Sequence, residues 1–361
     1  MNVMQIAAYC AEFPGNFIFS LLSIDKKIKK EGGEIIYVFP NEAQNKAWCI
    51  ELQRSRKVFF LPLARARLKW KTYSKIRKIC QNEKIDIIHS HFELYDIPCL
   101  FTSKRIKIVW HLHDAIGAEK GLRAIIRKLQ YRYLPERAVV VPIFDDDRKK
   151  LVNMKCPENN IHVIPNGIST EALVNITIPK DHPIFLSMGW DYKRKGIDLI
   201  ITAAKRLREE YQNFELIINC RKDTMPQIQE QIDINSDWIN IQLPQKNMSD
   251  IYNKANVFIQ ASRHETFSFA VCEASYVGLK LIISDIPGLT WAQKLESVCV
   301  FENGNADDLY LKMKEIVEGF SEIKWDCSSD KRMIEERYST KRWANDVYSV
   351  YKELLEDESR S

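Results

Sequence analysis

The chain has 361 residues, which is more than one hydrophobic core usually serves, so we expect two domains. Its content of 45% hydrophobic and 28% charged residues is typical of a water-soluble protein, and no apolar run is long enough for a membrane-spanning helix. The nine cysteines form no Cys-x-x-Cys pair, which argues against disulfides and a cysteine metal site. The first residues enter a strand without the features of a signal peptide, so a cytoplasmic location is expected.

The chain begins with the pattern of a βαβ unit. Residues 5–9 predict a strand, residues 17–30 a helix, and residues 34–39 a second strand. The turn after the first strand contains Gly15 and Asn16. Because glycine lets a backbone approach a ligand closely, this turn is a candidate binding loop.

Two segments, 65–78 and 121–133, predict basic amphipathic helices. In the first, the expected inward residues are Leu68, Thr72, Ile76 and Ile79, with Trp70 and Tyr73 outward. In the second, the expected core stripe is Leu122, Ile125, Ile126, Leu129 and Tyr133. Such helices are consistent with docking on an anionic membrane, and reversing the charges of Arg67, Lys71 and Arg127 should then abolish it. A solvated charged face is the alternative, and no nucleic-acid-binding fold is recognised.

Histidines gather on two predicted strands in the middle of the first half. Residues 86–92 contain His89 and His91, and residues 106–114 contain His111 and His113. A histidine at the carboxyl end of a strand can hydrogen-bond a hydroxyl group, although a lone strand histidine is more often structural. Four histidines in two strands favour a binding cleft.

The run Asp145-Asp146-Asp147 has the form of a metal-binding Asp-x-Asp, but we expect a helix start there instead. The run follows the apolar strand 139–143 and precedes a basic segment. Carboxylates at a helix start satisfy free N–H groups and the helix dipole without a metal. No metal is therefore predicted.

The second half opens with strand 184–189, a polar loop and a helix that starts at Gly196. Arg194 and Lys195 come directly before the helix. Two adjacent cations at this position can hold a diphosphate, and the guanidinium does so with two hydrogen bonds. The alternative is a pair of solvated loop cations.

The most informative stretch is residues 262–288, which predict a loop, a helix and a strand after the buried strand 256–261. It carries Glu265 and Glu273 with seven residues between them. The N–H groups of Thr266, Phe267 and Ser268 are expected to open the helix, where they favour an anion such as phosphate. The candidate binding residues of this stretch are Phe267, Ser268 and Glu273. Solvated carboxylates are the alternative.

This stretch resembles the Glu-x7-Glu region of the family 4 retaining glycosyltransferases. The residues that fit in register are Ser262, Glu265, Phe267, Glu273, Ala274, Gly278, Ile282, Ser284, Asp285 and Gly288. Segments 163–167, Val-Ile-Pro-Asn-Gly, and 195–203 also resemble family motifs, and His113 matches the family's active-site histidine. The chain departs from the family at Trp190, Ser268 and Lys280, where arginine, glycine and proline are usual.

The resemblance implies an α/β fold of the GT-B type, with two Rossmann-like domains facing a cleft. The expected domains are an acceptor-binding domain (1–168), a nucleotide-sugar-binding domain (169–340), and a C-terminal helix (341–361) that returns to the first domain. A stripe of apolar residues suits that helix: Trp343, Val347, Val350, Tyr351 and Leu354.

The resemblance also implies a retaining, metal-independent transfer of a sugar from a nucleoside-diphosphate donor, most simply a UDP-sugar, with no other cofactor. The acceptor would be a lipid-linked or polysaccharide hydroxyl at the cytoplasmic face of a membrane. Arg194 and Lys195 would neutralise the leaving diphosphate, Glu265 would hold the donor sugar and Glu273 the ribose. His113 would contact the reacting sugar or acceptor, and Gly15 and Asn16 would face the donor phosphates and the acceptor. An inactive GT-B subunit and a nucleotide-sugar 2-epimerase remain alternatives.

Overall fold

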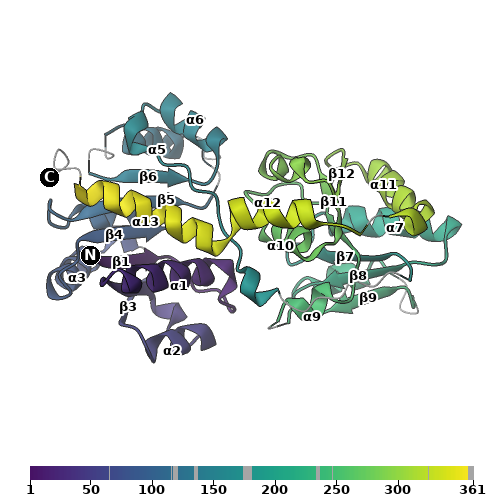
Figure 1. Cartoon of the computed structure of the whole chain (residues 1–361), viewed down its shortest axis with the longest axis horizontal. Helices are drawn as coiled ribbons and strands as arrows, with labels where there is room; N and C mark the ends of the chain where they lie inside the picture. The colour runs from purple at the N-terminus through teal and green to yellow at the C-terminus, as the bar shows by residue number, and fades with distance from the viewer. Residues whose placement is uncertain are drawn as a thin grey trace. The chain divides into compact units, whose positions relative to one another are not determined.

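The computed structural model describes residues 1–64, 66–114, 116, 121–133, 137–173, 181–232, 236–245, 247–323 and 325–356. The chain divides into two compact units (Figure 1). The first unit combines Met1–Gly167 with Thr340–Ser361, and the second is Ile168–Ser339. Within the described residues, each unit is built on a six-stranded sheet whose strand pairs are all parallel.

The first sheet has the strand order β3-β2-β1-β4-β5-β6. Its strands are β1 (Asn2–Ala7), β2 (Glu34–Pro40), β3 (Val58–Leu61), β4 (Ile87–His91), β5 (Lys107–Leu112) and β6 (Val139–Pro142). Its helices are α1 (Gly15–Lys30), α2 (Ala47–Gln53), α3 (Trp70–Asn82), α4 (Asp96–Leu100), α5 (Leu122–Tyr133), α6 (Asp145–Asn153) and α13 (Thr340–Glu356). Strands buried on both faces read as continuous apolar runs, as β2 and β6 do, whereas β1 is interrupted by the buried Gln5.

Helices cover both faces of the first sheet. On one face α1, α2 and α13 pack onto side chains of β1, β2, β4, β5 and β6, and α13 runs beside α1 (Figure 1). The predicted stripe of α13 is confirmed, since Trp343, Val347, Val350, Tyr351 and Leu354 are all buried there. The C-terminal helix therefore completes the core of the first unit.

The second sheet repeats the same topology, in the order β12-β11-β10-β7-β8-β9. Its strands are β7 (Ile184–Met188), β8 (Glu215–Asn219), β9 (Ile239–Gln242), β10 (Val257–Gln260), β11 (Lys280–Ser284) and β12 (Val298–Phe301). Its helices are α7 (Ile197–Glu210), α8 (Met225–Gln229), α9 (Ser249–Tyr252), α10 (Phe269–Val277), α11 (Ala306–Glu318) and α12 (Ser328–Tyr338). Helices α7 and α11 pack on one face of this sheet.

The two basic helices differ from the sequence prediction in which side chains face outward. In the first, Thr72, Ile76 and Ile79 are buried and Trp70 is exposed as expected, but Leu68 is 82% exposed because it lies before α3 in a short 3-10 turn. The expected core residues of α5 are wrong: Ile125, Ile126, Leu129 and Tyr133 are all exposed. Among the α5 side chains that the structure describes, those of Gln130 and Tyr131 are buried. Arg65 and the side chain of Leu122 lie outside the described residues.

The cause of this reversal is a polar contact that the periodicity does not reveal. Arg127 forms an ion pair with Glu93, and the Tyr131 hydroxyl donates to Glu93 Oε1 at 3.2 Å. These bonds turn the polar side of α5 toward the β4–α4 connection. The apolar side is therefore left on the surface.

Candidate active site

Each sheet has one point where the strand order reverses, between β1 and β4 in the first unit and between β7 and β10 in the second. Ligands of open parallel sheets bind outside the carboxyl ends of the strands at such points. Gly15 and Asn16, which were predicted to lie in the turn after β1, are the first two residues of α1, and His91 ends β4. In the second unit the loop with Arg194 and Lys195 follows β7, and the loop with Glu265 follows β10.

In the second unit the predicted cations and Glu265 come together. Lys195, which is 5% exposed, places Nζ 2.5 Å from Glu265 Oε1, and an Arg194 guanidinium nitrogen lies 3.4 Å from the same oxygen. Burial lowers the pKa of Lys195, and the nearby Glu265 carboxylate opposes that shift. Asp191 holds the other side of Arg194, at 3.1 Å from Nε. The loops after β7 and β10 thus form one ionic cluster.

Glu265 uses its two carboxylate oxygens unequally. Oε1 accepts hydrogen bonds from the Ser262 hydroxyl at 2.8 Å and from Gln260 Nε2 at 3.1 Å, in addition to Lys195 and Arg194. Among the described residues no hydrogen bond to Oε2 is present. One oxygen therefore fixes the carboxylate in place, and the other can accept from a ligand hydroxyl.

Trp190, which stands where the family usually has arginine, packs on both cations. Its ring centroid lies 4.4 Å from the Arg194 guanidinium carbon and 4.8 Å from Lys195 Nζ. Such cation–π contacts contribute about 0.5–1 kcal/mol at partly exposed sites. The aromatic ring thus orients the two charges without adding a third positive charge.

Two glycines permit the close approach of the site loops. A Cβ atom on Gly196 would lie 1.9 Å from the carbonyl oxygen of Ala261, and one on Gly288 would lie 2.1 Å from that of Glu265. Real Cβ atoms do not come this close to backbone oxygens, so any side chain would push the loops apart. Gly196 also has a positive φ of 66°, which favours glycine independently.

The helix after Glu265 begins later than the sequence predicted. α10 starts at Phe269, so the amides of Thr266, Phe267 and Ser268 precede the helix. Ser268 has φ 60°, a left-handed conformation that cannot continue a helix, and it caps α10 by accepting a hydrogen bond from Val271 N at 3.4 Å. The orphan N–H groups of the first turn therefore begin at Phe269. Phe267 is buried, and its carbonyl accepts a hydrogen bond from Trp291.

Glu273 lies on α10, half-buried. It accepts a hydrogen bond of 2.8 Å from the Tyr252 hydroxyl, which comes from α9. Burial raises the pKa of Tyr252 well above its usual value, so the hydroxyl keeps its proton and remains a donor. Glu273 is thus held at the β10–α10 side of the switch point with a fixed orientation.

In the first unit His113 directly follows β5. Its Nε2 lies 3.0 Å from His91 Nδ1, and its Nδ1 lies 3.0 Å from Asn166 Oδ1. The Phe92 ring is 4.6 Å away between centroids. Burial lowers the pKa of His113 to about 4, and the contact with Asn166 opposes the shift, so the imidazole is neutral at pH 7. Asn166 belongs to the Pro-Asn-Gly segment, but sequence reasoning did not assign it to the site.

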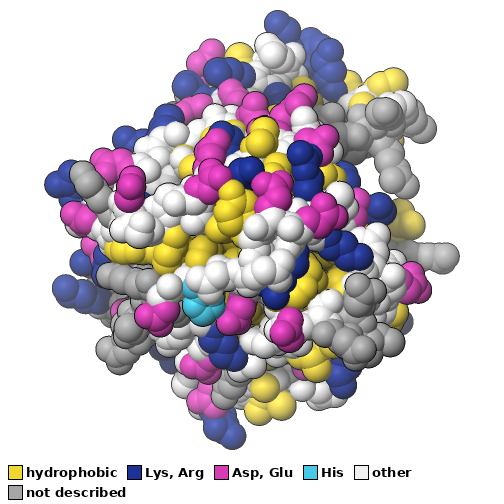
Figure 2. Space-filling model, turned by 90° about the vertical axis from the view of Figure 1, so that its right-hand side faces the viewer, with side chains coloured by type: hydrophobic (Ala, Val, Ile, Leu, Met, Phe, Trp, Pro, Cys, Tyr) yellow, Lys and Arg dark blue, Asp and Glu magenta, His cyan; other side chains and the backbone are white. Residues whose placement is uncertain are grey.

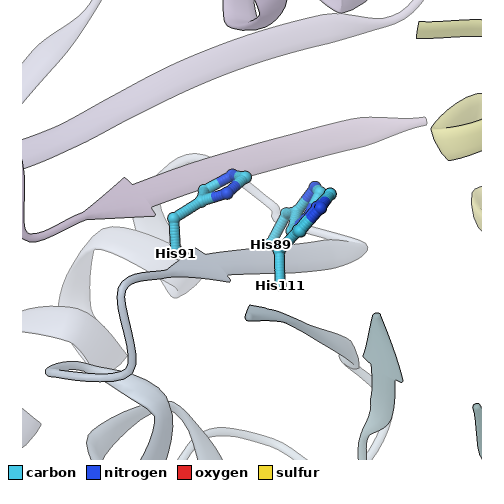
Figure 3. A group of neighbouring side chains, drawn as sticks. All are labelled: His89, His91 and His111. Carbon is cyan, nitrogen blue, oxygen red and sulfur yellow. The ribbon is translucent and has the colours of Figure 1, made fainter. Parts of the chain in front are cut away.

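The other three histidines form a buried cluster on the same face of the first sheet (Figure 3). His89, His91 and His111 bring ring nitrogens within 4.8 Å of one another, a grouping that could hold a metal ion. All of these ring nitrogens except His111 Nε2 are nonetheless engaged in hydrogen bonds: His89 Nε2 lies 3.2 Å from His111 Nδ1, and His91 Nε2 lies 2.8 Å from Gln5 Oε1. Binding a metal would break these bonds.

The acidic run Asp145–Asp147 occupies the first turn of α6, as predicted. Asp147 accepts hydrogen bonds from Ile116 N at 3.4 Å and Lys150 Nζ at 2.9 Å, and Asp146 pairs with Lys149. These partners explain the run through local ion pairs and one backbone contact, whereas the expected side-chain cap of α6 is not formed.

Comparison with solved structures identifies the fold. A glycosyltransferase from Rickettsia africae superposes with a TM-score of 0.84 over 99% of each chain, at 16% identity. The Anabaena protein HepE, solved in complex with UDP-glucose, superposes with a TM-score of 0.76 over 98% of this chain and 100% of its own, at 14% identity. The fold is therefore that of the GT-B glycosyltransferases.

Sequence comparison gives the family. Residues 26–172 match the model described as Glycosyltransferase Family 4, and residues 169–338 match the model described as Glycosyl transferases group 1. An uncharacterized glycosyltransferase of Methanocaldococcus jannaschii is 23% identical over 305 residues, which cover 76% of this chain and 77% of that protein. The chain belongs to the family 4 retaining glycosyltransferases, as the Glu-x7-Glu stretch predicted.

Proposed function

We propose that this enzyme transfers a sugar from a UDP-linked donor, bound by the second unit, to an acceptor hydroxyl bound by the first unit. The observation that carries the proposal is the cluster of Arg194, Lys195 and Glu265 at the switch point of the second sheet. A diphosphate leaving group gains negative charge as the glycosidic bond breaks. Fixed cations that meet this charge lower the barrier without a metal ion.

The remaining predicted residues fit separate parts of such a donor. The free Oε2 of Glu265 accepts hydrogen bonds from donor sugar hydroxyls, and Glu273 accepts them from the ribose. The amides of Phe267 and Ser268, with the start of α10, face the phosphates. The complex of HepE with UDP-glucose supports uridine as the base, because that protein shares the fold across its whole length.

In the first unit, His113 contacts the reacting sugar or the acceptor, and Gly15 and Asn16 line the same strand edge. Gly15 has a positive φ of 54°, and Asn16 is buried at the start of α1. Both lie after β1, next to the strand that ends in His91. The acceptor therefore meets a neutral, hydrogen-bonding surface.

The test is a panel of nucleotide sugars, scored by thermal shift and by slow hydrolysis of the donor without acceptor. A ligand that binds only the native state raises the unfolding temperature. We expect one UDP-sugar to give a shift that disappears in Arg194→Ala and Glu273→Ala, while kcat falls about 100-fold in Lys195→Ala because fixed charge at the leaving group is lost.

Arg206→Ala is the matched control, because Arg206 is a half-exposed cation of the same unit whose ion pair is with Asp307 on α11. It should keep both the thermal shift and the turnover. Absence of a shift with every nucleotide sugar, or equal losses in Arg206→Ala, would refute the donor site.

We further propose that the acceptor is lipid-linked and that the enzyme docks on an anionic membrane through α5. Ile125, Ile126, Leu129 and Tyr133, here called the apolar face of α5, are between 48% and 57% exposed. Exposed Lys128 and Arg132 flank them. Apolar side chains with basic neighbours on one helix suit the interface of an anionic bilayer. Within the described residues no helix is long and apolar enough to cross a bilayer.

We propose a smaller part in docking for the first basic segment, because Arg67 is engaged within the protein. Arg67 donates its guanidinium hydrogens to the carbonyls of Glu93 and Leu94, and Arg127 pairs with Glu93, so both have structural roles. Lys71 and Trp70 remain exposed. The face of the molecule seen in Figure 2 differs from the apolar face of α5, because acidic and basic side chains are interspersed on it.

A further inference from the structure

Glu265 already occupies the two cations that a donor diphosphate would use. Lys195 Nζ lies 2.5 Å and Arg194 Nη1 lies 3.4 Å from the same carboxylate oxygen, Oε1. The Glu265 side chain is 8% exposed and the Lys195 side chain is 5% exposed, so water screens these charges only weakly. Any anion that binds the two cations therefore shares them with an almost buried carboxylate.

The contact lengths limit how far such an anion can lie from Glu265. A phosphate oxygen accepts a hydrogen bond from an ammonium nitrogen at up to about 3.2 Å. Because Glu265 Oε1 lies 2.5 Å from Lys195 Nζ, the two anionic oxygens are then at most about 6 Å apart. Like charges at this distance repel each other in a weakly screened site, so Glu265 lowers the affinity of the cations for a bare anion.

The Glu265 carboxylate cannot turn away from the cations without breaking further contacts. Its Oε1 also accepts hydrogen bonds from the Ser262 hydroxyl at 2.8 Å and from Gln260 Nε2 at 3.1 Å. The two site loops are joined directly as well, because Arg263 N donates to the carbonyl of Arg194 at 2.8 Å. The negative charge of Glu265 is therefore fixed close to any anion that the cations bind.

The donor and its product present different charges to this carboxylate. When the glycosidic bond breaks, its electron pair stays on the outer phosphate oxygen, the sugar carbon bonds to the acceptor oxygen, and the acceptor hydroxyl gives up its proton. The outer phosphate then carries about two negative charges instead of one at neutral pH, because the second pKa of a terminal phosphate lies near 6. UDP also lacks the sugar hydroxyls that can donate to Glu265 Oε2.

We propose that Glu265 makes the site prefer the intact UDP-sugar to UDP, and that it thereby favours release of UDP after transfer. With a UDP-sugar bound, the sugar hydroxyls donate to Oε2 and offset the repulsion between the carboxylate and the diphosphate. With UDP bound, the repulsion is larger and no sugar offsets it. Glu265 is thus a specificity-determining residue, a role that rests on the proposed function and adds product release to it.

The test compares Glu265→Gln with wild type by titration calorimetry, using UDP and the UDP-sugar that gives a thermal shift. Glutamine keeps the shape of the side chain and removes its charge. The Kd for UDP should fall about tenfold because the repulsion is lost, whereas the Kd for the UDP-sugar should not fall, because its charge-assisted bonds to Glu265 are lost too. Titration at pH 6.5 favours protonated Lys195, since burial lowers its pKa and the variant lacks the opposing Glu265 charge.

Asp307→Asn is the matched control, because it also replaces an ion-paired carboxylate of the second unit by an amide. Asp307 lies on α11, pairs with Arg206 and is 81% exposed. The variant should bind UDP and the UDP-sugar as wild type does. Wild type alone supplies a second test, since it should bind UDP about fivefold or more weakly than the UDP-sugar.

Three results would overturn the inference: no tighter binding of UDP by folded Glu265→Gln, equal tightening in Asp307→Asn, or wild type that binds UDP as tightly as the UDP-sugar. The third needs no variant, so it decides the question if Glu265→Gln does not fold. If wild type binds neither UDP nor any nucleotide sugar, the proposed function itself fails. If wild type binds both without this preference, the proposed function stands and only the role of Glu265 in product release is lost.

Discussion

At the scale of single residues, Ser268 stands where the family usually has glycine, and its backbone conformation lowers the stability of the folded state. A non-glycine residue at φ 60° is strained by contact between its Cβ and the backbone, by about 1 kcal/mol. The hydroxyl offsets part of this strain, because it caps α10 through Val271 N. Glycine, the usual family residue, would relieve the strain but lose the cap.

We expect Ser268→Gly to raise the free energy of unfolding by about 0.5 kcal/mol, because relief of strain exceeds the loss of the cap. Ser268→Ala should lower it by about 1 kcal/mol, because the strain stays and the cap is lost. Urea denaturation of the two variants beside wild type gives both values. Equal destabilisation in both variants would show that the cap, not the backbone strain, decides the stability at this position.

The residues of the second-unit site were predictable because they are local in sequence. Arg194 and Lys195 lie within one loop, and Glu265 and Glu273 lie in one strand–loop–helix segment with recognisable spacing. The partners of His113 were not predictable in the same way. Its hydrogen-bond partners His91 and Asn166 are 22 and 53 positions away, and these contacts depend on the pairing of β4 with β5 and on where the segment after β6 lies.

At the scale of elements, regular periodicity predicted most strands and the helices α1, α7 and α13 to within a few residues. The short edge strands β3 and β12 were not predicted, nor were α11 and α12. Each of the two strands has four residues, too few for alternation to be distinguished from an apolar turn. For α5 the pattern correctly placed the apolar residues on one side of the helix. It did not show that this side faces outward, because the contacts of Arg127 and Tyr131 with Glu93 leave no periodic signal in the sequence.

The exposed apolar face of α5 gives a prediction for membrane docking. Replacing Ile126 and Leu129 together by glutamate should reduce sedimentation with anionic liposomes about tenfold or more, because apolar burial and charge attraction are both lost. Donor hydrolysis in solution should remain. Vesicles of zwitterionic lipid should bind the wild type weakly, as expected if Lys128 and Arg132 contribute through charge.

Leu311→Glu serves as the control for that pair, because Leu311 on α11 is 50% exposed in the second unit. It should sediment with liposomes as wild type does. Unchanged sedimentation of the α5 double variant would assign the apolar face to a protein partner or to no partner, and the membrane proposal would be withdrawn.

At the scale of the whole molecule, buried titratable groups of the first unit set how its stability depends on pH. Burial lowers the pKa values of His89, His91 and His111 well below their usual range and that of His113 to about 4. In the unfolded chain each takes up a proton near pH 6.5. The stabilising effect of neutral burial is therefore complete above pH 6.5 and is lost as the pH falls from 6.5 toward 4.

Asp96 acts in the opposite direction. Burial raises its pKa to about 7, with the nearby Glu93 carboxylate adding to the shift, while the neighbouring Ser90 hydroxyl and the Arg67 and Arg127 charges oppose it. The folded state thus holds a proton that the unfolded chain releases near pH 4, so the contribution of Asp96 falls as the pH rises from about 4 to about 7. Four histidines outweigh one carboxyl group, and the net stability should rise with pH up to about 6.5.

These two opposing contributions can be separated by Asp96→Asn, which keeps the shape of the side chain and cannot ionise. We expect this variant to be more stable than wild type by about 2–4 kcal/mol at pH 8, where wild type must ionise Asp96 inside the core, and nearly equal to it at pH 4.5. Urea unfolding followed by hydrogen exchange of peptides from β4 and β5 reports on the first unit alone. A constant difference between the two proteins from pH 4.5 to 8 would mean that Asp96 does not titrate in this range, and the acid loss seen in both would then belong to the histidines.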